Sequence, residues 1–319
     1  MRVTVLGASG GIGSAIVKEL ARRGHAVTAV NRAGDADVPT GVARLAADVA
    51  AAPDAERVCA GSDVVVMAAQ PAYHRWPQEW PPMMRSVLDA ATAVGTRLVF
   101  TDNLYAYAPA AGPLRETSPE HATDTKGVVR RELGHLLLDA HRRGDLRVVI
   151  GRFSDYYGPN ASHSGLHMVG IESGLRGRTM RGMFDLDQLH TFHYLPDAAR
   201  GFAELIEHPE ADGRIWLLPA AAPITQRELL GLVNAHLDRP VRIGRVTPVL
   251  LRVAGWFSPL LREARSSVVQ FDRPWVVDAT RFNQAFGAIR TTPHAEAVAQ
   301  TVAWCRQRDD RRRVVQPAA

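Results

Sequence analysis

Short apolar runs alternate with helical repeats of apolar positions over the first half of the chain. Six runs, several of them rich in β-branched side chains, predict strands at residues 3–6, 26–30, 44–47, 63–67, 97–101 and 146–150. Between them, apolar positions at helical spacing predict helices at 12–23, 54–60, 82–94 and 128–143. Strictly alternating strands and helices with short connections favour an α/β fold with a doubly wound parallel sheet.

The pattern loosens after Gly151, where glycine, proline and histidine become frequent. Helices are still predicted at 197–207, 225–237 and 293–306, and a strand at 214–218. We therefore expect a first domain at 1–151 and a smaller mixed region at 152–319 that mainly binds substrate. Some of the later strands and helices are expected to return to the first domain.

A glycine-rich turn joins the first predicted strand to the first predicted helix. Gly7, Gly10 and Gly13 let the chain turn tightly and let phosphate oxygens approach the backbone, while the helix offers unpaired N–H groups. Such turns also occur without a ligand, but inside a strand–helix–strand unit this spacing favours a Rossmann-type dinucleotide site. The residues expected at this turn are Gly7, Ser9, Gly10, Gly11, Ile12 and Gly13.

Residues at the ends of the next strands bear on which dinucleotide is bound. The second strand ends in Asn31-Arg32, where an NAD enzyme is expected to place a carboxylate for the ribose hydroxyls. The guanidinium of Arg32 suits a 2′-phosphate, so we predict NADP(H) in preference to NAD(H); a solvated arginine is the alternative. Further cofactor contacts are expected at Asp48, Val49, Ala68, Ala69 and Gln70.

Several other segments share their pattern with one enzyme family. They are Val65–Ala69, Phe100–Tyr107, Arg152–Pro159, His190–Asp197 and Val277–Gly287. With the glycine turn and Asp48-Val49, these segments make the chain similar to the extended short-chain dehydrogenases/reductases of the NAD-dependent epimerase/dehydratase type. The resemblance extends over nearly the whole chain. It implies an enzyme with a Rossmann-type sheet, a nicotinamide cofactor and a smaller C-terminal substrate-binding region.

The resemblance implies three catalytic positions, and the chain departs from the family at all of them. The family places a Ser or Thr after the fifth strand, then a Tyr-x-x-x-Lys pair in which Tyr is the general acid/base and Lys holds the nicotinamide ribose. Here Asn103, Lys126 and Arg130 stand at these positions. A lysine can donate a proton much as a tyrosine does, and an arginine keeps the positive charge for the ribose. Lys126, Arg130 and Phe153 complete the expected cofactor contacts.

The composition draws further attention to Lys126. The chain has 36 Arg and only two Lys, Lys18 and Lys126, a bias typical of a GC-rich genome. A surviving lysine at the proton-donor position favours a function that arginine cannot perform, with chance as the alternative. The formal charge of +5 is small and dispersed, and 46% hydrophobic with 22% charged residues excludes disorder. No nucleic-acid or membrane partner is expected.

Other side chains near the strand ends are alternative proton donors or substrate contacts. Tyr105 and Tyr157 are the alternative donors, although tyrosines in such clefts more often form walls. Substrate contacts are expected from Asn103, Tyr105, Ser154, Tyr156, His190 and His193. His190 stands where sugar-nucleotide relatives carry an arginine for the substrate phosphate, which argues against a nucleotide sugar. The histidines lack partners at ligand spacing, so no metal is expected.

These observations predict an NADP(H)-dependent oxidoreductase acting on a carbonyl or hydroxyl group of a small or medium, non-nucleotide substrate. Two alternatives stay open: an epimerase or dehydratase that uses the dinucleotide without net redox change, and a non-catalytic NADP(H)-binding sensor or regulator. A homodimer through helices 82–94 and 128–143 is expected to use Met83, Met84, Val87, Leu88, Val129, Leu133 and Leu137. Two reduced cysteines and the lack of an apolar leader predict a cytoplasmic protein.

Overall fold

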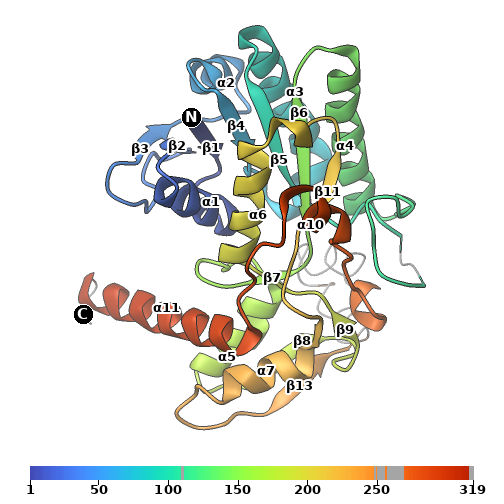
Figure 1. Cartoon of the computed structure of the whole chain (residues 1–319). Helices are drawn as coiled ribbons and strands as arrows, with labels where there is room; N and C mark the ends of the chain where they lie inside the picture. The colour runs from blue at the N-terminus through green and yellow to red at the C-terminus, as the bar shows by residue number, and fades with distance from the viewer. Residues whose placement is uncertain (109–110, 248, 250–255, 257–268, 316–319) are drawn as a thin grey trace.

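A seven-stranded parallel sheet forms the centre of the computed structural model, which describes residues 1–108, 111–247, 249, 256 and 269–315 (Figure 1). In spatial order its strands are β11 (Ile215–Leu217), β6 (Val148–Phe153), β5 (Arg97–Asn103), β4 (Val64–Met67), β1 (Arg2–Leu6), β2 (Ala26–Asn31) and β3 (Ala43–Ala46). All neighbouring pairs run parallel. The chain reverses its direction of travel across the sheet between β1 and β4, as in other doubly wound folds. The predicted fold class is confirmed.

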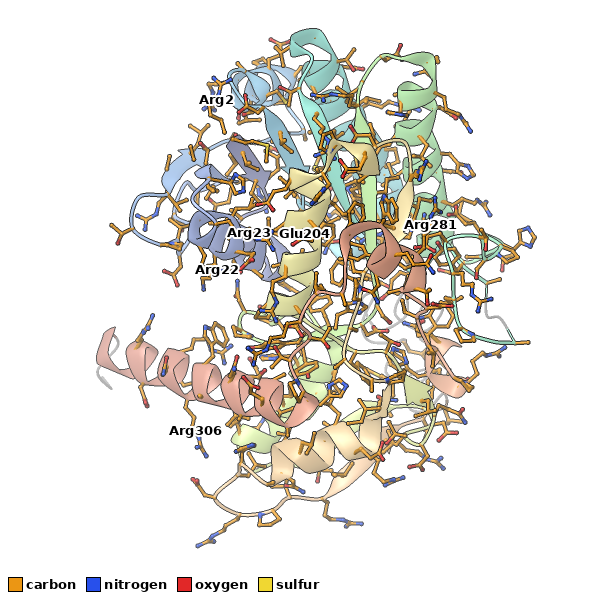
Figure 2. All side chains as sticks on the ribbon, in the orientation of Figure 1. Arg2, Arg22, Arg23, Glu204, Arg281 and Arg306 are labelled. Carbon is orange, nitrogen blue, oxygen red and sulfur yellow. The ribbon has the colours of Figure 1, made fainter. Side chains whose placement is uncertain are left out.

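Different helices cover the two faces of the sheet (Figure 1). One face carries α1 (Gly11–Arg22), α6 (Leu195–Glu207) and α10 (Thr280–Phe286). The other carries α2 (Ala52–Cys59), α3 (Trp76–Val94) and α4 (Thr125–Arg143). On the first face, Arg23 just after α1 points toward Glu204 of α6, and the two side chains pair at 2.8 Å (Figure 2). Helices on both faces explain why the strands are almost continuously apolar.

The second half of the chain builds a lower lobe with a core of its own (Figure 1). Its strand pairs are β7 (Tyr156–Tyr157) with β10 (His193–Tyr194), β9 (Leu189–His190) with β12 (Ile224–Thr225), and β8 (Met180–Met183) with β13 (Ile243–Val246). Its helical segments include η2 (Leu166–Ile171), α5 (Glu172–Leu175), α7 (Gln226–Asn234), η5 (Val269–Asp272) and α11 (His294–Val315). Outside this lobe lie two short turns: η1 (Tyr73–Arg75), which precedes α3, and η3 (Pro209–Ala211), which follows α6. Strand β11 and helix α6 return to the large sheet, and the domain boundary at residue 151 stays a prediction.

The start of α3 differs most from the predicted elements, because the helix begins at Trp76 and not at residue 82. Prolines at 77, 81 and 82 hide this beginning in the sequence, since proline is unfavourable inside a helix. Trp76 and Trp80 are spaced by one helical turn and are both buried. Their burial extends the helix toward the carboxyl edge of the sheet, where it reaches the candidate site.

The apolar side chains of α3 and α4 that were expected to form a dimer surface face the sheet. The seven apolar side chains assigned to it are all buried in the core between these helices and the sheet. The helical repeat identified an apolar face correctly, but that face covers the sheet. These seven residues therefore do not form a dimer surface, and a homodimer through other residues of the two helices stays a prediction. Among the described helices, none is long and apolar enough to cross a membrane.

Candidate functional site

The glycine turn has the geometry of a phosphate-binding loop. Gly7 has a φ of 83°, and the N–H groups of Gly7 and Ala8 both donate to the carbonyl of Val30. A Cβ atom on Gly13 would lie 2.2 Å from the Gly7 carbonyl oxygen, so only glycine fits there. Helix α1 then starts without a side-chain cap at Gly10, which leaves its first N–H groups for a ligand. The turn fits the pyrophosphate of a dinucleotide.

Asn160, in the connection that follows β7, closes one side of this turn. Its amide Nδ2 donates to the Ser9 carbonyl and to the Ser14 hydroxyl, at 3.0 Å each. A Cβ on Gly11 would lie 3.1 Å from the Asn160 carbonyl, so a larger residue at position 11 would press this connection slightly away from the turn. Ser9 itself is exposed and Ile12 is half-buried. The lower lobe thus contacts the cofactor turn directly.

The end of β2 presents a carboxylate that the sequence pattern did not assign to the cofactor. Asn31 donates from Nδ2 to Asp35 Oδ1 at 2.8 Å, and the Asp35 N–H donates back to Asn31 Oδ1 at 3.2 Å. Arg32 is exposed. After β3, Val49 is buried, while exposed Asp48 accepts the Ala50 N–H within its own turn. Asp35 therefore lies at the strand end where a dinucleotide ribose is expected.

A chain of contacts connects the glycine turn to Arg130 on α4. A Cβ on Gly7 would meet the Ala69 nitrogen at 2.6 Å, so the segment Ala68–Gln70 lies directly against the turn. Next to it, Gln70 Oε1 accepts a hydrogen bond from Arg130 at 3.1 Å. The cation at the family's lysine position is thereby placed beside the predicted cofactor path.

Lys126 and Arg130 are one helical turn apart and both lie against aromatic rings. Lys126 is fully buried; its Nζ donates to the Tyr73 carbonyl at 2.5 Å and lies 4.7 Å from the Tyr73 ring centroid. The guanidinium of Arg130 lies 4.0 Å from the Trp80 ring and 4.6 Å from the Trp76 ring. Cations over aromatic faces are stabilised by the ring quadrupole. The turn η1 thus holds Lys126, and the start of α3 holds Arg130.

Buried carboxylates neutralise the guanidinium groups under the site. Asp102 accepts from Arg130 at 2.9 Å and from Arg152 at 2.7 Å, and Arg152 also pairs with Glu120 at 2.5 Å. Arg152 and Asp102 are completely buried. Burial lowers the pKa of Arg130, and the Asp102 charge opposes this effect. The network fixes α4 against β5 and β6.

Two tyrosines share this region with Asn103. The Asn103 carbonyl oxygen Oδ1 accepts the Tyr105 N–H at 3.0 Å, so it forms a local turn after β5. Burial raises the pKa of Tyr105 well above its usual value, helped by Tyr73 and the Asp155 charge. Burial and Asp155 also raise the pKa of Tyr156, to about 12. Both phenols therefore stay protonated at neutral pH.

A second polar cluster follows β6. His190 Nε2 lies 2.9 Å from Asp155 Oδ2 and 3.5 Å from the Ser154 hydroxyl. The His190 ring is stacked between Phe192 and Phe271, with centroid distances of 4.5 and 4.8 Å. Ser154 and His190 thus form one cluster with Asp155, and their role as substrate contacts stays a prediction.

Tyr157 and His193 do not join the site. Tyr157 is fully buried in the lower lobe, 2.8 Å from His294 Nδ1, and burial raises its pKa. Both ring nitrogens of His193 are used: Nδ1 accepts the Ser154 N–H at 3.1 Å, and Nε2 donates to the Leu218 carbonyl at 3.0 Å. Their assignments as proton donor and substrate contact are therefore corrected to structural roles. Phe153, also buried, packs against the His193 ring.

Comparison with known proteins identifies the family. The model of the NAD dependent epimerase/dehydratase family matches residues 3–218. The chain belongs to this family. A dTDP-glucose 4,6-dehydratase from Streptomyces griseus is 28% identical, over 94% of this chain and 92% of that protein. The predicted resemblance to extended short-chain dehydrogenases/reductases is confirmed, and the family is one of enzymes.

Solved structures of low identity share the fold of this family member. A UDP-glucuronic acid 4-epimerase from Bacillus cereus, in complex with NAD, superposes with a TM-score of 0.79 at 16% identity, over 96% of this chain and 99% of its own. A UDP-glucose 4-epimerase from Thermus thermophilus, also with NAD, gives 0.78 at 21% identity, over 96% and 99%.

These relatives correct the predicted function. All three are enzymes of nucleotide sugars, and none is named as a reductase. The prediction of an NADP(H)-dependent oxidoreductase with a non-nucleotide substrate is therefore wrong. The argument from His190 failed because one missing arginine says little about how the rest of a site holds a phosphate. The solved neighbours contain NAD, which leaves the predicted preference for NADP(H) without support.

Sequence reasoning missed the residues that hold the site together. Asp155 lies inside the segment Arg152–Pro159, but it was not assigned a role. Tyr73, Trp76 and Trp80 were hidden by the prolines around them, and Asp102 by its place within a strand. The available signal for Asp102 was its place directly after the apolar run of β5, because a charged residue that a strand continues into needs a buried partner. Among the described residues, no cluster of three histidine, cysteine or acidic side chains forms a metal site.

Proposed function

We propose that the chain is an epimerase or dehydratase of a nucleotide sugar that uses NAD(H) without net redox change. The observation that carries the proposal is the contact path from Gly7 through Ala68–Gln70 to Arg130, in a chain that belongs to the epimerase/dehydratase family. The glycine turn, which can bind phosphate, and the fixed cation of Arg130 thus lie along the same carboxyl edge of the sheet. The identity with a dTDP-glucose 4,6-dehydratase over nearly the whole chain supports the substrate class.

The cofactor side of the site is formed by the chain's own backbone and by Arg130. The N-terminal amides of α1 hold the pyrophosphate, and Arg130, fixed by Asp102 and Gln70, holds the ribose next to the nicotinamide. A nicotinamide bound here would supply a reversible acceptor for a hydride of the sugar. Arginine cannot give up its proton, so Arg130 positions the cofactor and a second group moves the proton.

Lys126 is proposed as the group that moves the proton. It lies one turn from Arg130, and the carbonyl and ring of Tyr73 hold its amine at the same edge. In the proposed cycle the neutral amine of Lys126 takes the proton of the sugar hydroxyl during oxidation, and the resulting ammonium returns it to the alkoxide during reduction. Tyr105 is a further titratable side chain in this region, but its raised pKa keeps the phenol protonated, which makes it a poor base.

NAD(H) is proposed in place of NADP(H) because of Asp35. Its carboxylate, fixed by Asn31 at the end of β2, is a hydrogen-bond acceptor for ribose hydroxyls and repels a 2′-phosphate. Arg32 is exposed there and has no partner among the described residues. A fixed acceptor beside a solvated cation favours the unphosphorylated ribose.

The test is a turnover assay with purified protein, NAD and either dTDP-glucose or UDP-glucose. We expect a new nucleotide sugar in the product analysis, with no accumulation of reduced cofactor measured by its near-ultraviolet absorbance. With a substrate that carries deuterium at C4 of the sugar, retention of the deuterium in the product shows that the hydride is returned within the enzyme and does not exchange with free cofactor. Stoichiometric reduction of NAD, or binding of NAD without any product, contradicts the proposal; the second result favours the sensor alternative.

A further inference from the structure

Asp155 is a carboxylate at the border between the cofactor side of the site and the lower lobe. It lies two residues after the end of β6, and its carbonyl accepts the His193 N–H at 2.8 Å, which fixes the backbone. Its side chain is 22% exposed, whereas the His190 ring beside it is buried. Asn103 of β5 lies opposite Phe153 of β6, so Asp155 follows at the same carboxyl edge of the sheet as Asn103 and Tyr105, and its charge raises the pKa of Tyr105 and of Tyr156. Asp155 thus faces the region where the substrate is expected.

Among the residues that the structure describes, partners are found for one oxygen of this carboxylate. His190 Nε2 lies 2.9 Å from Oδ2, and Gln270 Nε2 donates to the same atom at 3.4 Å. Within the described part of the chain, Oδ1 has no hydrogen-bond partner. The stacking of His190 between Phe192 and Phe271 prevents the ring from turning away. The result is a fixed acceptor whose second oxygen is open to a ligand.

The neighbouring guanidinium groups do not compensate a further negative charge. Arg130 is paired with Asp102, and Arg152 is paired with both Asp102 and Glu120. A ligand carboxylate beside Asp155 would therefore meet a like charge in a partly buried site, where such repulsion is weakly screened. A ligand hydroxyl or amine would donate to Oδ1 and gain a charge-assisted hydrogen bond.

We propose that Asp155 determines which sugars the site accepts: it binds a hydroxyl or amino group of the sugar and excludes uronic acids. This inference rests on the proposed function, because it assumes that the ligand is a nucleotide sugar. It goes beyond that function by limiting the substrate to neutral or amino sugars.

The experiment compares the binding of UDP-glucose and UDP-glucuronic acid to the NAD-loaded protein by calorimetry, so that turnover is not needed. The two ligands differ at one group of the sugar, which is a hydroxymethyl group in UDP-glucose and a carboxylate in UDP-glucuronic acid. We expect the wild type to bind UDP-glucose at least about tenfold more tightly. In Asp155→Asn the amide oxygen can still accept a hydrogen bond from His190, and the amide NH2 group faces the ligand as a donor. The preference for UDP-glucose over UDP-glucuronic acid should therefore fall below about threefold. Asp139→Asn, at the exposed end of α4 where Asp139 pairs with Arg142, should keep the full preference.

Each outcome separates the two proposals. Binding of both ligands by the wild type without discrimination, or an unchanged preference in a folded Asp155→Asn, overturns the role of Asp155 and leaves the proposed function standing. Binding of NAD but of neither nucleotide sugar overturns both. If Asp155→Asn fails to bind NAD, the affinities of the wild type for the two ligands decide. Tighter binding of UDP-glucose supports the inference, and equal binding of the two ligands overturns it.

Discussion

Asp102 accepts a hydrogen bond from Arg130 on one carboxylate oxygen and from Arg152 on the other, at 2.9 and 2.7 Å. All three side chains are buried. One carboxylate thereby links the helix that carries Lys126 to the strand that precedes Asp155. The same residue positions the cation proposed for the cofactor and stabilises the edge of the sheet around it.

Replacing Asp102 with Asn should therefore destabilise the fold. Both guanidinium groups would lose their shared counter-charge in the interior, and breaking a buried pair in this way costs about 3–5 kcal/mol. Urea unfolding measures the change. Asp63→Asn is the matched control, because Asp63 pairs with Arg2 on the surface and its loss should change the unfolding midpoint little. Equal stabilities of the two variants would contradict the buried network.

Lys126→Met and Lys126→Arg should both lose turnover while still binding NAD. Methionine fits among the aromatic rings but moves no proton, and arginine keeps the charge but cannot be deprotonated. Removing a general acid/base lowers kcat by about 100-fold or more. Steady-state kinetics and a cofactor titration measure the two effects. Turnover of Lys126→Arg within about threefold of the wild type would exclude the proton-transfer role.

Gly13→Ala should weaken cofactor binding by at least about tenfold. The added Cβ would lie 2.2 Å from the Gly7 carbonyl oxygen, so the turn that presents the amides must open. Fluorescence titration with the dinucleotide measures the affinity. Gly231→Ala in α7 is the control, since its Cβ meets no atom within 4 Å and alanine favours the helix. Unchanged affinity in Gly13→Ala would place the cofactor elsewhere.

Asp35→Asn should reduce the preference for NAD over NADP. The wild type is expected to bind NAD at least about tenfold more tightly, because Asp35 accepts from the ribose and repels the 2′-phosphate. Removing the charge should narrow the ratio of the two dissociation constants. The nearby exposed Asp37 supplies the control variant, Asp37→Asn, with an unchanged ratio. A wild type that prefers NADP would restore the role first predicted for Arg32.

His193 should make the protein less stable in mild acid. Burial lowers the pKa of His193 to about 4, whereas an unfolded histidine titrates near 6.5. Between these values the unfolded state binds more protons than the folded state, so the free energy of unfolding falls as the pH falls. The loss is about 3 kcal/mol between pH 6.5 and pH 4.

Denaturant unfolding across this pH range measures that loss. In His193→Gln the part of the pH dependence due to this ring should disappear, while His121→Gln, at an exposed position, should follow the wild type. Parallel stability curves for the wild type and His193→Gln would show that His193 is not the group responsible.

The sequence alone determined the frame of the molecule. β-branched runs and helical repeats placed almost every element of the large sheet, because each strand is buried on both sides and each covering helix has one apolar face. The turn at Gly7–Gly13 was readable because its glycines are required by local geometry. The resemblance to the family, and not a local pattern, assigned Lys126 and Arg130 to the catalytic positions, and this assignment stays a prediction.

Tertiary structure decided which of these side chains meet and which face each helix presents. The apolar residues of α3 and α4 were read as a dimer surface, but a helical repeat shows only that a face is apolar and not what covers it. Asp155, Asp102 and Trp80 come from segments far apart in the chain, and their roles depend on partners that no local pattern reveals. His193 and Tyr157 left the site for the same physical reason, because burial and hydrogen bonding are fixed only when the lower lobe packs around them.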